Sequence, residues 1–412
     1  MSMSACEADC VVIGGGAAGM MAAITAGERG RRVLLLEHEK FCGRKLRITG
    51  KGRCNLCNNC DIRSLLAHVP HNAKFLQGCL HRFGPAETMS FFEESGVPLK
   101  TERGSRVFPQ SDRAHDVANA LEKRMRRAGV RFHQAAADSI CVQDGRVTGV
   151  VAGGQKLSCE SVLIATGGMS YPLTGSTGDG YVLARALGHR VVPPRPSLVP
   201  LECAEPDCAQ MQGFSLKNVR LTAIDDRGER VYSDLGELLF THFGVSGPLV
   251  LSASAYMREF EARRWHLEID LKPGLDGEQL DARILRDFAK FRNREFQNAL
   301  SELAGRSMIP VLVARSGIPP ETKVHSITRE QRRRLAELFK AFSLTVTGTR
   351  GFSEAIVTAG GVDVTEVDPR SMRSRLVPGL FFAGEVLDVD ACTGGFNLQI
   401  AWSTGHAAGE RL

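Results

Sequence analysis

The glycine-rich segment near the start of the chain constrains the fold more than any other feature. Three glycines are spaced as Gly14-x-Gly16-x-x-Gly19. They follow a short apolar run, Cys10–Ile13, and open a run of small residues, Ala17–Arg29. In a strand–turn–helix unit the first glycine permits a tight turn, the second lets a pyrophosphate approach the backbone, and the third lets the helix pack closely on the strand. The segment therefore predicts a helix whose N-terminus is directed at an anionic ligand.

An acidic residue follows at a suitable distance. Val33–Leu36 is a second apolar run, and Glu37 stands at its end, 18 residues after Gly19. A carboxylate in that position accepts hydrogen bonds from a ribose diol and repels a 2′-phosphate. The pattern predicts an adenine dinucleotide site. Its predicted residues are Gly14, Gly16, Ala17, Ala18, Gly19 and Glu37.

The far end of the chain favours a flavin over a nicotinamide. The apolar run Leu380–Ala383 leads into Gly384 and Glu385, and the pair Gly394–Gly395 precedes a predicted helix, Leu398–Ala408. A helix N-terminus stabilises the negative charge that collects on the pyrimidine edge of a reduced flavin. A polar residue after a strand, such as Glu385, is suited to the ribityl hydroxyls. Both ends of the chain are therefore predicted to build one FAD-binding domain.

Composition agrees with a globular protein of two or three domains. The chain has 412 residues, of which 43% are apolar and 24% charged, and its formal net charge is +6. This mild positive charge fits an anionic ligand and does not by itself indicate nucleic-acid binding. The apolar stretch Val11–Gly27 is interrupted by glycines and follows acidic residues, so it is neither a leader nor a membrane helix by pattern. We predict a cytoplasmic protein without a membrane partner.

A proline cluster from Pro193 to Pro200 and later changes of pattern divide the chain. The predicted domains are an FAD-binding domain of residues 1–192 and 345–412, a β-rich insertion of residues 193–275 and a helical insertion of residues 276–344. Thr328 and Gln331 have the spacing of a capping box within the last of these. Within the first, a loop is predicted over residues 42–60, a helical stretch near 71–95 and a meander of hairpins over 140–165.

Several motifs together resemble the YhiN/BaiN-like flavoprotein family, some of whose members are described as aminoacetone oxidase-like. They are GGGAAG at residues 14–19, TGKGRCN at 49–55, ATGG at 165–168, GSTGDG at 175–180, FTHFGVSGP at 240–248 and GGFN at 394–397. The resemblance covers almost the whole chain. It implies an α/β fold with a Rossmann-like, glutathione-reductase-type FAD-binding domain, an inserted β-barrel-like domain and a smaller helical domain.

The resemblance also implies further contacts to FAD. Arg44 and Lys45 would lie along the pyrophosphate, Ala137 would contact adenine through its backbone, and Thr166 and Gly167 would close the adenosine side. The residues expected at the ribityl chain and flavin ring are Gly52, Arg53, Cys54, Asn55, Gly384, Glu385, Gly395, Phe396 and Asn397. The sequence departs from the family pattern at Cys57, where a threonine is usual.

Three side chains are candidates for the chemistry. Hydride transfer to or from a flavin leaves a proton to be placed, and His242 and Ser246 are suited to handle it. A single histidine in a loop is more often structural or merely exposed than catalytic. Cys54 is a candidate for a redox role beside the ring. Cys54, Cys57 and Cys60 have the spacing of part of an iron–sulfur ligand run, but they lack a clear fourth ligand, so no metal site is predicted.

The predicted function is that of an FAD-dependent oxidoreductase that exchanges a hydride with a small organic substrate, such as an amine or an enone. NAD(P)H stays open as an electron donor, although no second strand–GxGxxG–helix unit is present. The basic runs Arg124–Arg127 and Arg332–Arg334 lack interleaved aromatic residues, which argues against a nucleic-acid partner. A flavoprotein that acts on RNA and a non-catalytic flavin redox sensor remain as alternatives. The sequence leaves the substrate and the oligomeric state open.

Overall fold

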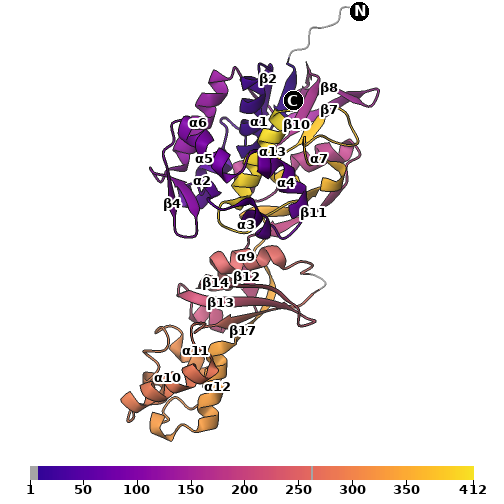
Figure 1. Ribbon diagram of the computed structural model, residues 1–412. Helices are drawn as coiled ribbons and strands as arrows, with labels where there is room; N and C mark the ends of the chain where they lie inside the picture. Colours follow the sequence, from indigo (N-terminus) through magenta and orange to yellow (C-terminus); the bar gives the residue numbers. More distant parts are fainter. Residues whose placement is uncertain (1–7, 261–262) are drawn as a thin grey trace, which may run out of the picture. The chain divides into compact units, whose positions relative to one another are not determined.

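The computed structural model describes residues 8–260 and 263–412, and the chain divides into two compact units. Unit 1 contains both ends of the chain, Met1–Ser197 and Gly351–Leu412, and unit 2 is the intervening segment Leu198–Arg350 (Figure 1). Among the described residues, none of the helices has the length and apolar character needed to cross a membrane.

A five-stranded parallel sheet forms the centre of unit 1, in the order β19-β10-β1-β2-β6. Its strands are β1 (Cys10–Ile13), β2 (Val33–Glu37), β6 (Arg131–Gln134), β10 (Ser161–Ile164) and β19 (Leu380–Phe382). Consecutive residues of β1, β10 and β19 are buried, as expected where helices cover both faces of a parallel sheet. The order reverses between β1 and β10, and open α/β sheets bind their ligands at the carboxyl ends of the strands at such a point.

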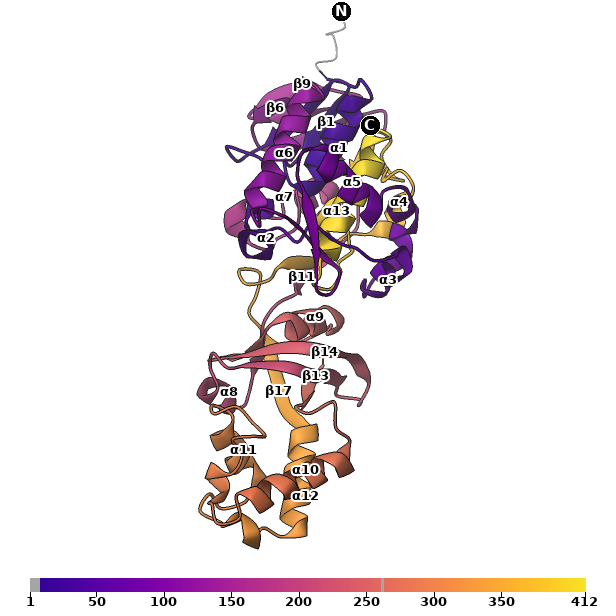
Figure 2. The ribbon, with the colours of Figure 1, turned by 60° about the vertical axis from the view of Figure 1, so that its left-hand side comes forward.

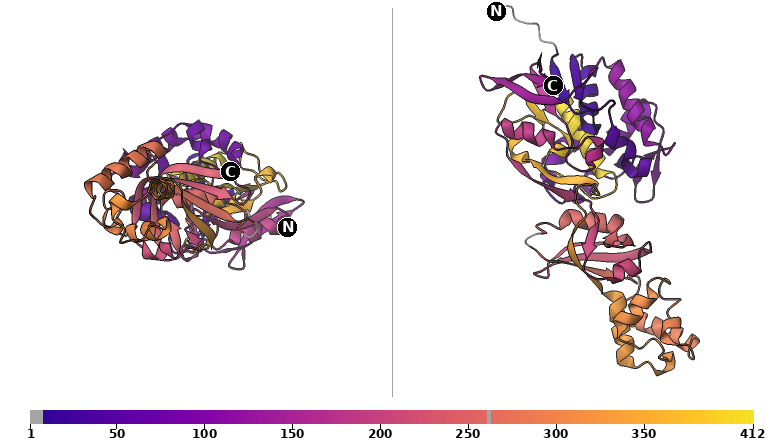
Figure 3. Two further views of the ribbon diagram at one scale, coloured as in Figure 1. Left: turned by 90° about the horizontal axis from the view of Figure 1, so that it is seen from below. Right: turned by 180° about the vertical axis from the view of Figure 1, so that it is seen from behind.

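The first and last helices of unit 1 pack together on this sheet. They are α1 (Ala17–Glu28) and α13 (Phe396–Gly409), which lie in contact although they stand at opposite ends of the sequence (Figure 3). Small residues permit the close approach, because a Cβ placed on Gly405 would lie 2.4 Å from the Ala18 carbonyl oxygen. Both chain ends thus contribute to one sheet, and the predicted Rossmann-like fold is confirmed.

The remaining elements of unit 1 surround the sheet. The helices are α2 (Arg44–Gly52), α3 (Ile62–Ala67), η1 (Ala73–Leu76), α4 (Gln77–Arg82), α5 (Pro85–Glu94), α6 (Ala114–Arg127), η2 (Pro172–Thr174), α7 (Asp179–Ala186), η5 (Val364–Glu366) and η6 (Gly384–Val386). One small sheet has the order β3 (Cys57–Asn58), β5 (Arg106–Pro109) and β4 (Leu99–Glu102). A second is the meander of β7 (Ala137–Gln143), β8 (Arg146–Ala152) and β9 (Gln155–Ser158). The third is the antiparallel pair of β11 (Val191–Ser197) and β18 (Val357–Val362).

Two local predictions need correction. The loop expected over residues 42–60 contains a helical turn, α2, which begins after Gly43 and loses helical backbone angles at Thr49, Gly50 and Lys51. The single helical stretch expected near 71–95 is broken into η1, α4 and α5. Pro85 at the first position of α5, with Gly84 as its N-cap, starts a new helix there.

Unit 2 consists of a closed six-stranded barrel and a group of helices (Figure 2). The barrel order is β12 (Leu201–Cys203), β15 (Gly244–Ser246), β14 (Arg230–Thr241), β13 (Ser215–Asp225), β16 (Trp265–Asp270) and β17 (Phe342–Thr349). The helices are α8 (Asp207–Gln210), α9 (Pro248–Tyr256), α10 (Gly277–Lys290), η3 (Phe296–Asn298), α11 (Ile309–Ser316), η4 (Val324–Ser326) and α12 (Arg329–Lys340). Barrel residues Phe240 and Trp265 and helix residues Ile284 and Phe339 belong to one apolar core.

The predicted capping box of α12 is present. The Thr328 hydroxyl accepts from the Gln331 backbone N–H at 3.2 Å, and the Gln331 side chain accepts from the Thr328 N–H at 2.9 Å. This reciprocal pair satisfies two N–H groups that the helix itself leaves without partners.

Candidate functional site

The carboxyl edge of the sheet in unit 1 brings distant predicted segments together. Gly14 follows β1, Glu37 ends β2, Thr166 follows β10 and Gly384 follows β19. A Cβ placed on Gly14 would lie 2.5 Å from the carbonyl oxygen of Ala165, so the turns after β1 and β10 touch. These segments therefore border the crevice at which the strand order reverses.

The glycine turn has the backbone geometry that its spacing predicts. Gly14 has a φ of 103°, which only glycine adopts readily, and a Cβ on Gly19 would lie 1.9 Å from the Gly14 carbonyl oxygen. A Cβ on Gly16, in contrast, would meet no atom of the described chain within 4 Å. The first turn of α1 has no side-chain cap and no acidic residue. Its N–H groups are thus left for an external acceptor beside open space, as a pyrophosphate requires.

Glu37 is fixed beside this turn. Its Oε2 accepts from the Gly15 N–H at 2.8 Å, and its Oε1 accepts from the Glu39 N–H at 2.9 Å. The side chain is 12% exposed. The carboxylate therefore has a defined position at the end of β2, which is where a ribose diol is expected.

Thr166 carries an unsatisfied hydroxyl in the same crevice. Among the described residues its Oγ1 is buried and has no hydrogen-bond partner. A Cβ placed on Gly180 would lie 2.1 Å from this oxygen, so the absence of a side chain at Gly180 leaves room for the hydroxyl. A buried polar group without a partner costs free energy, and a ligand that bonds to it removes this cost. The crevice therefore fits FAD in shape and in chemistry.

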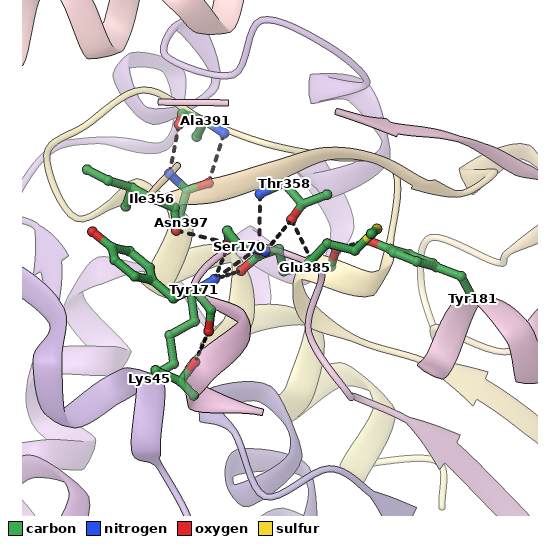
Figure 4. Close-up of polar contacts among 11 residues, drawn as sticks. Lys45, Ser170, Tyr171, Tyr181, Ile356, Thr358, Glu385, Ala391 and Asn397 are labelled. Carbon is green, nitrogen blue, oxygen red and sulfur yellow. Dashed lines mark hydrogen bonds and ion pairs between the residues drawn. The ribbon is translucent and has the colours of Figure 1, made fainter. Parts of the chain in front are cut away.

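Glu385 is the centre of a second cluster of polar side chains (Figure 4). Lys45 Nζ donates to Glu385 Oε2 at 2.8 Å and to Ser170 Oγ at 2.5 Å. The Ser170 hydroxyl and the Thr358 N–H both donate to Glu385 Oε1, at 2.8 and 2.9 Å. The structure thus pairs Lys45, predicted at the pyrophosphate, with Glu385, predicted at the ribityl chain.

Ser170 and Thr358 were missed as site residues. Thr358 Oγ1 accepts from the N–H groups of Met169 and Ser170, at 2.8 and 3.1 Å, and so holds the segment after β10 against β18. The sequence signal for these two residues is that each stands in a short motif rich in small residues, Ser170-Tyr-Pro and Thr358-Ala-Gly-Gly.

The N-terminus of α13 brings together the other predicted flavin residues. The Asn55 amide lies 3.0 Å from the Gly395 nitrogen and 3.2 Å from the Cys57 carbonyl oxygen, so its oxygen accepts from the former and its nitrogen donates to the latter. Asn397 Oδ1 accepts from the Ala391 N–H at 2.9 Å, and its Nδ2 donates to the Ala391 carbonyl at 2.7 Å. Phe396 is buried and stacks on His68, with ring centroids 4.4 Å apart.

Four other predicted FAD residues have defined positions. Arg44 forms an ion pair with Glu39. Arg53 stacks over Phe108, 4.2 Å from the ring centroid, and its Nε donates to Asp112 at 2.8 Å. Gly52 has a φ of 83° and open space at its Cβ position, and Ala137 begins β7. Their contacts to the cofactor remain predictions.

The environments of the cysteines near the predicted flavin ring favour the unreactive thiol over the thiolate. Cys54 is fully buried, and burial raises its pKa to about 12. Burial also raises the pKa of Cys57 and of the half-buried Cys60. A thiolate is the reactive form of cysteine, and these environments disfavour it at neutral pH. Within residues 8–260 and 263–412 no group of three or more His, Cys, Asp or Glu side chains could hold a metal ion.

His242 and Ser246 belong to unit 2. His242 is exposed in the turn between β14 and β15, and Ser246 is the last residue of β15, opposite Leu239. Their approach to the flavin remains a prediction. Sequence reasoning also missed the Cys-x4-Cys pair Cys203 and Cys208 in this unit, whose thiols are hydrogen-bonded to each other.

This geometry is that of a flavoprotein oxidoreductase of the Rossmann type, with FAD as its cofactor. The chain belongs to the HI0933-like family, whose Rossmann-domain model matches residues 8–411. The resemblance to YhiN/BaiN-like flavoproteins is thereby confirmed.

Relatives with assigned activities match over nearly their full length. The chain is 32% identical over 402 residues to a 3-dehydro-bile acid delta(4,6)-reductase of Clostridium scindens, with 97% of each chain covered. It is also 32% identical over 405 residues to a ribosomal RNA dihydrouridine synthase of Escherichia coli, with 98% of each covered. These relatives support an oxidoreductase and leave its substrate open.

The fold is similar to solved flavoenzyme structures. One is a 3-ketosteroid delta1-dehydrogenase from Sterolibacterium denitrificans in complex with 1,4-androstadiene-3,17-dione. The TM-score is 0.52 with 14% sequence identity, and the match covers 98% of this chain and 99% of that one. At that identity the likeness establishes the fold alone.

Proposed function

We propose that this protein uses FAD to reduce a carbon–carbon double bond conjugated to a carbonyl group. The observation that carries the proposal is that the names of two relatives describe the same type of reaction. A 3-dehydro-bile acid delta(4,6)-reductase acts on double bonds conjugated to a 3-oxo group, and a dihydrouridine synthase acts on the uracil double bond beside a carbonyl. Reduction of a double bond directly conjugated to a carbonyl adds a hydride to the carbon β to the carbonyl and a proton to the α carbon.

The residues of unit 1 bind and orient the cofactor in this proposal. Reduced FAD supplies the hydride. The N-terminus of α1 and the bare backbone at Gly16 hold the pyrophosphate, and Glu37 accepts from the ribose hydroxyls. Glu385 accepts from the ribityl chain, and the ion pair with Lys45 holds that carboxylate in position. The N-terminus of α13, which has no acidic residue in its first turn, favours the anionic reduced ring.

The α carbon also needs a proton donor. Tyr171 follows Ser170 directly and is drawn with the Glu385 cluster in Figure 4, and its hydroxyl has no hydrogen bond to the described residues. His242 in unit 2 is the alternative donor, as predicted from the sequence. We assign the proton to one of these two groups, because Cys54 is fully buried and burial raises its pKa to about 12, which makes its thiol a weak acid.

A small conjugated carbonyl compound is the proposed substrate. Unit 2, which would supply the substrate-facing residue His242, carries 22 Lys and Arg against 21 Asp and Glu and is close to neutral. RNA-binding domains carry a marked positive excess. A uridine in RNA is the second candidate, favoured by the E. coli relative and by a second ribosomal RNA dihydrouridine synthase, from Haemophilus influenzae, at 30% identity over 404 residues.

The test is an anaerobic half-reaction. The purified holoprotein is reduced with dithionite to its equivalence point and mixed with cyclohex-2-enone, a 4-en-3-one steroid or a uridine-containing ribosomal RNA fragment. We expect the oxidised flavin absorbance to return with an enone, together with a product that carries two additional hydrogens. The unconjugated cyclohex-3-enone is the matched control and should leave the flavin reduced. Turnover of the RNA alone would establish the second candidate, and no turnover of any conjugated substrate would refute the proposal.

A further inference from the structure

Unit 1 has a cavity that none of the residues assigned to FAD lines. Its volume is about 490 Å³, within the range of small-molecule sites. It is bounded by the segment Asn72–Phe75, at η1, and by residues of the segment 364–375, around and after η5. Neither segment contains a predicted cofactor residue.

Three buried apolar side chains form part of the lining of this cavity. Phe75, Val364 and Val367 are buried, with exposed fractions of 8%, 7% and 1%. A small polar ion would leave these side chains without contacts. A ligand with an apolar body would cover them and gain free energy from the area removed from water.

Two cations stand at the same cavity. Lys74 and Arg375 line it and are exposed, and neither has an ion pair among the described residues. The carboxylates nearby are engaged elsewhere. Glu366 accepts from the Arg190 N–H at 2.9 Å and contacts His189 at 3.0 Å, and Asp388 accepts from Asn72 Nδ2 at 3.2 Å.

We infer that this cavity binds a small carboxylate with a flat apolar body. The apolar side chains accept the body, and Lys74 and Arg375 accept the carboxylate, with Arg375 able to bind it through two parallel N–H groups. Apolar cations are repelled by the same pair, and uncharged compounds gain only the apolar contact. The site is separate from the proposed reaction.

The test measures binding to the FAD-loaded protein by fluorine NMR. The probe is 6-fluoro-2-naphthoate, and the matched uncharged probe is (6-fluoronaphthalen-2-yl)methanol. The double variant Lys74→Gln/Arg375→Gln removes both charges, and Ala73→Trp fills the cavity from a lining position. Lys156→Gln removes an exposed lysine of β9 that does not line the cavity and is the control. Bound flavin per chain confirms that each variant is folded.

The wild-type protein and Lys156→Gln should bind the naphthoate equally. The double variant should bind it about tenfold more weakly while its affinity for the alcohol stays unchanged. Ala73→Trp should weaken both compounds. Equal naphthoate affinity in all variants, which would place the probe elsewhere on the protein, overturns the inference, and so does an absence of binding to the wild-type protein.

Discussion

A pair of glycine-to-alanine substitutions separates the two roles of the turn after β1. Gly16→Ala adds a methyl group where the chain has no atom within 4 Å, at a φ of −78° that any residue adopts. Gly19→Ala adds one that would lie 1.9 Å from the Gly14 carbonyl oxygen. Gly16→Ala should therefore weaken FAD binding, and Gly19→Ala should lower the free energy of unfolding.

The expected magnitudes follow from these contacts. Gly19→Ala forces α1 to move by more than about 1 Å against a backbone that cannot give way, and overpacking of this kind costs about 1–3 kcal/mol or more. Gly16→Ala should change the free energy of unfolding by less than about 1 kcal/mol, because the loss of a good N-cap is offset by a less flexible unfolded chain. Its methyl group displaces the pyrophosphate and weakens at least one charge-assisted hydrogen bond, which is worth about 1.5–3 kcal/mol.

The assay compares flavin-free protein with protein titrated with FAD. Urea unfolding of the flavin-free form should be nearly unchanged for Gly16→Ala and clearly destabilised for Gly19→Ala. FAD fluorescence titration should show a Kd raised roughly 10- to 100-fold for Gly16→Ala. Wild-type FAD affinity in Gly16→Ala would mean that the pyrophosphate does not approach this residue, and the assignment of the turn would be wrong.

Three other measurements test the site, and a fourth tests a buried histidine elsewhere in unit 1. Glu37→Gln loses the charge that faces the Gly15 N–H, and FAD titration should show a Kd raised about tenfold; an unchanged Kd would contradict the ribose assignment. Glu385→Gln leaves the half-buried Lys45 without its carboxylate partner. This substitution should lower the free energy of unfolding of the flavin-free protein by about 1.5–3 kcal/mol. The double variant Glu385→Gln/Lys45→Met should lose less, because no unpaired charge is left. Burial lowers the pKa of His189, so this residue stays neutral in the native state and takes up a proton on unfolding. Its contribution to the free energy of unfolding should be complete above about pH 6.5 and decline as the pH falls below that value. Urea titrations at several pH values should therefore show a flatter pH dependence of the free energy of unfolding for His189→Asn than for the wild-type protein. The same pH dependence in both proteins would exclude His189 as a cause. Because burial raises the pKa of Cys54 to about 12, iodoacetamide should label Cys60 before Cys54 in the native protein, as read by peptide mass mapping; early labelling of Cys54 would revive its redox role.

Features set by short-range sequence were predictable. The glycine turn, the meander and the α12 capping box each depend on residues within a few positions of one another, and each has the expected geometry. The pairing of Lys45 with Glu385 was not predictable, because it joins residues 340 positions apart and depends on where α2 and η6 end after folding. Helix α2 was missed because glycine and arginine dominate its sequence, although its helical backbone covers only the residues before Thr49.

The proline cluster near residue 193 is compatible with a connecting segment between domains and with an edge strand. The prolines indicated a domain boundary, and the segment itself forms β11, which pairs with β18 and is irregular between Val192 and Arg195. Proline is tolerated there because a two-stranded ribbon leaves one side of each strand without a neighbour. The sequence alone does not distinguish an edge strand of this kind from a linker.

The β11–β18 ribbon also governs how this chain can be divided. Ser197 and Val357 are opposite each other in the ribbon, and the chain departs from unit 1 directly after Ser197 and re-enters it at Gly351. The segment between those points occupies the place of an ordinary hairpin loop. Replacing it with a short glycine-rich turn would leave every strand of the parallel sheet intact, so the whole of unit 2 can be removed or exchanged as one contiguous stretch of gene.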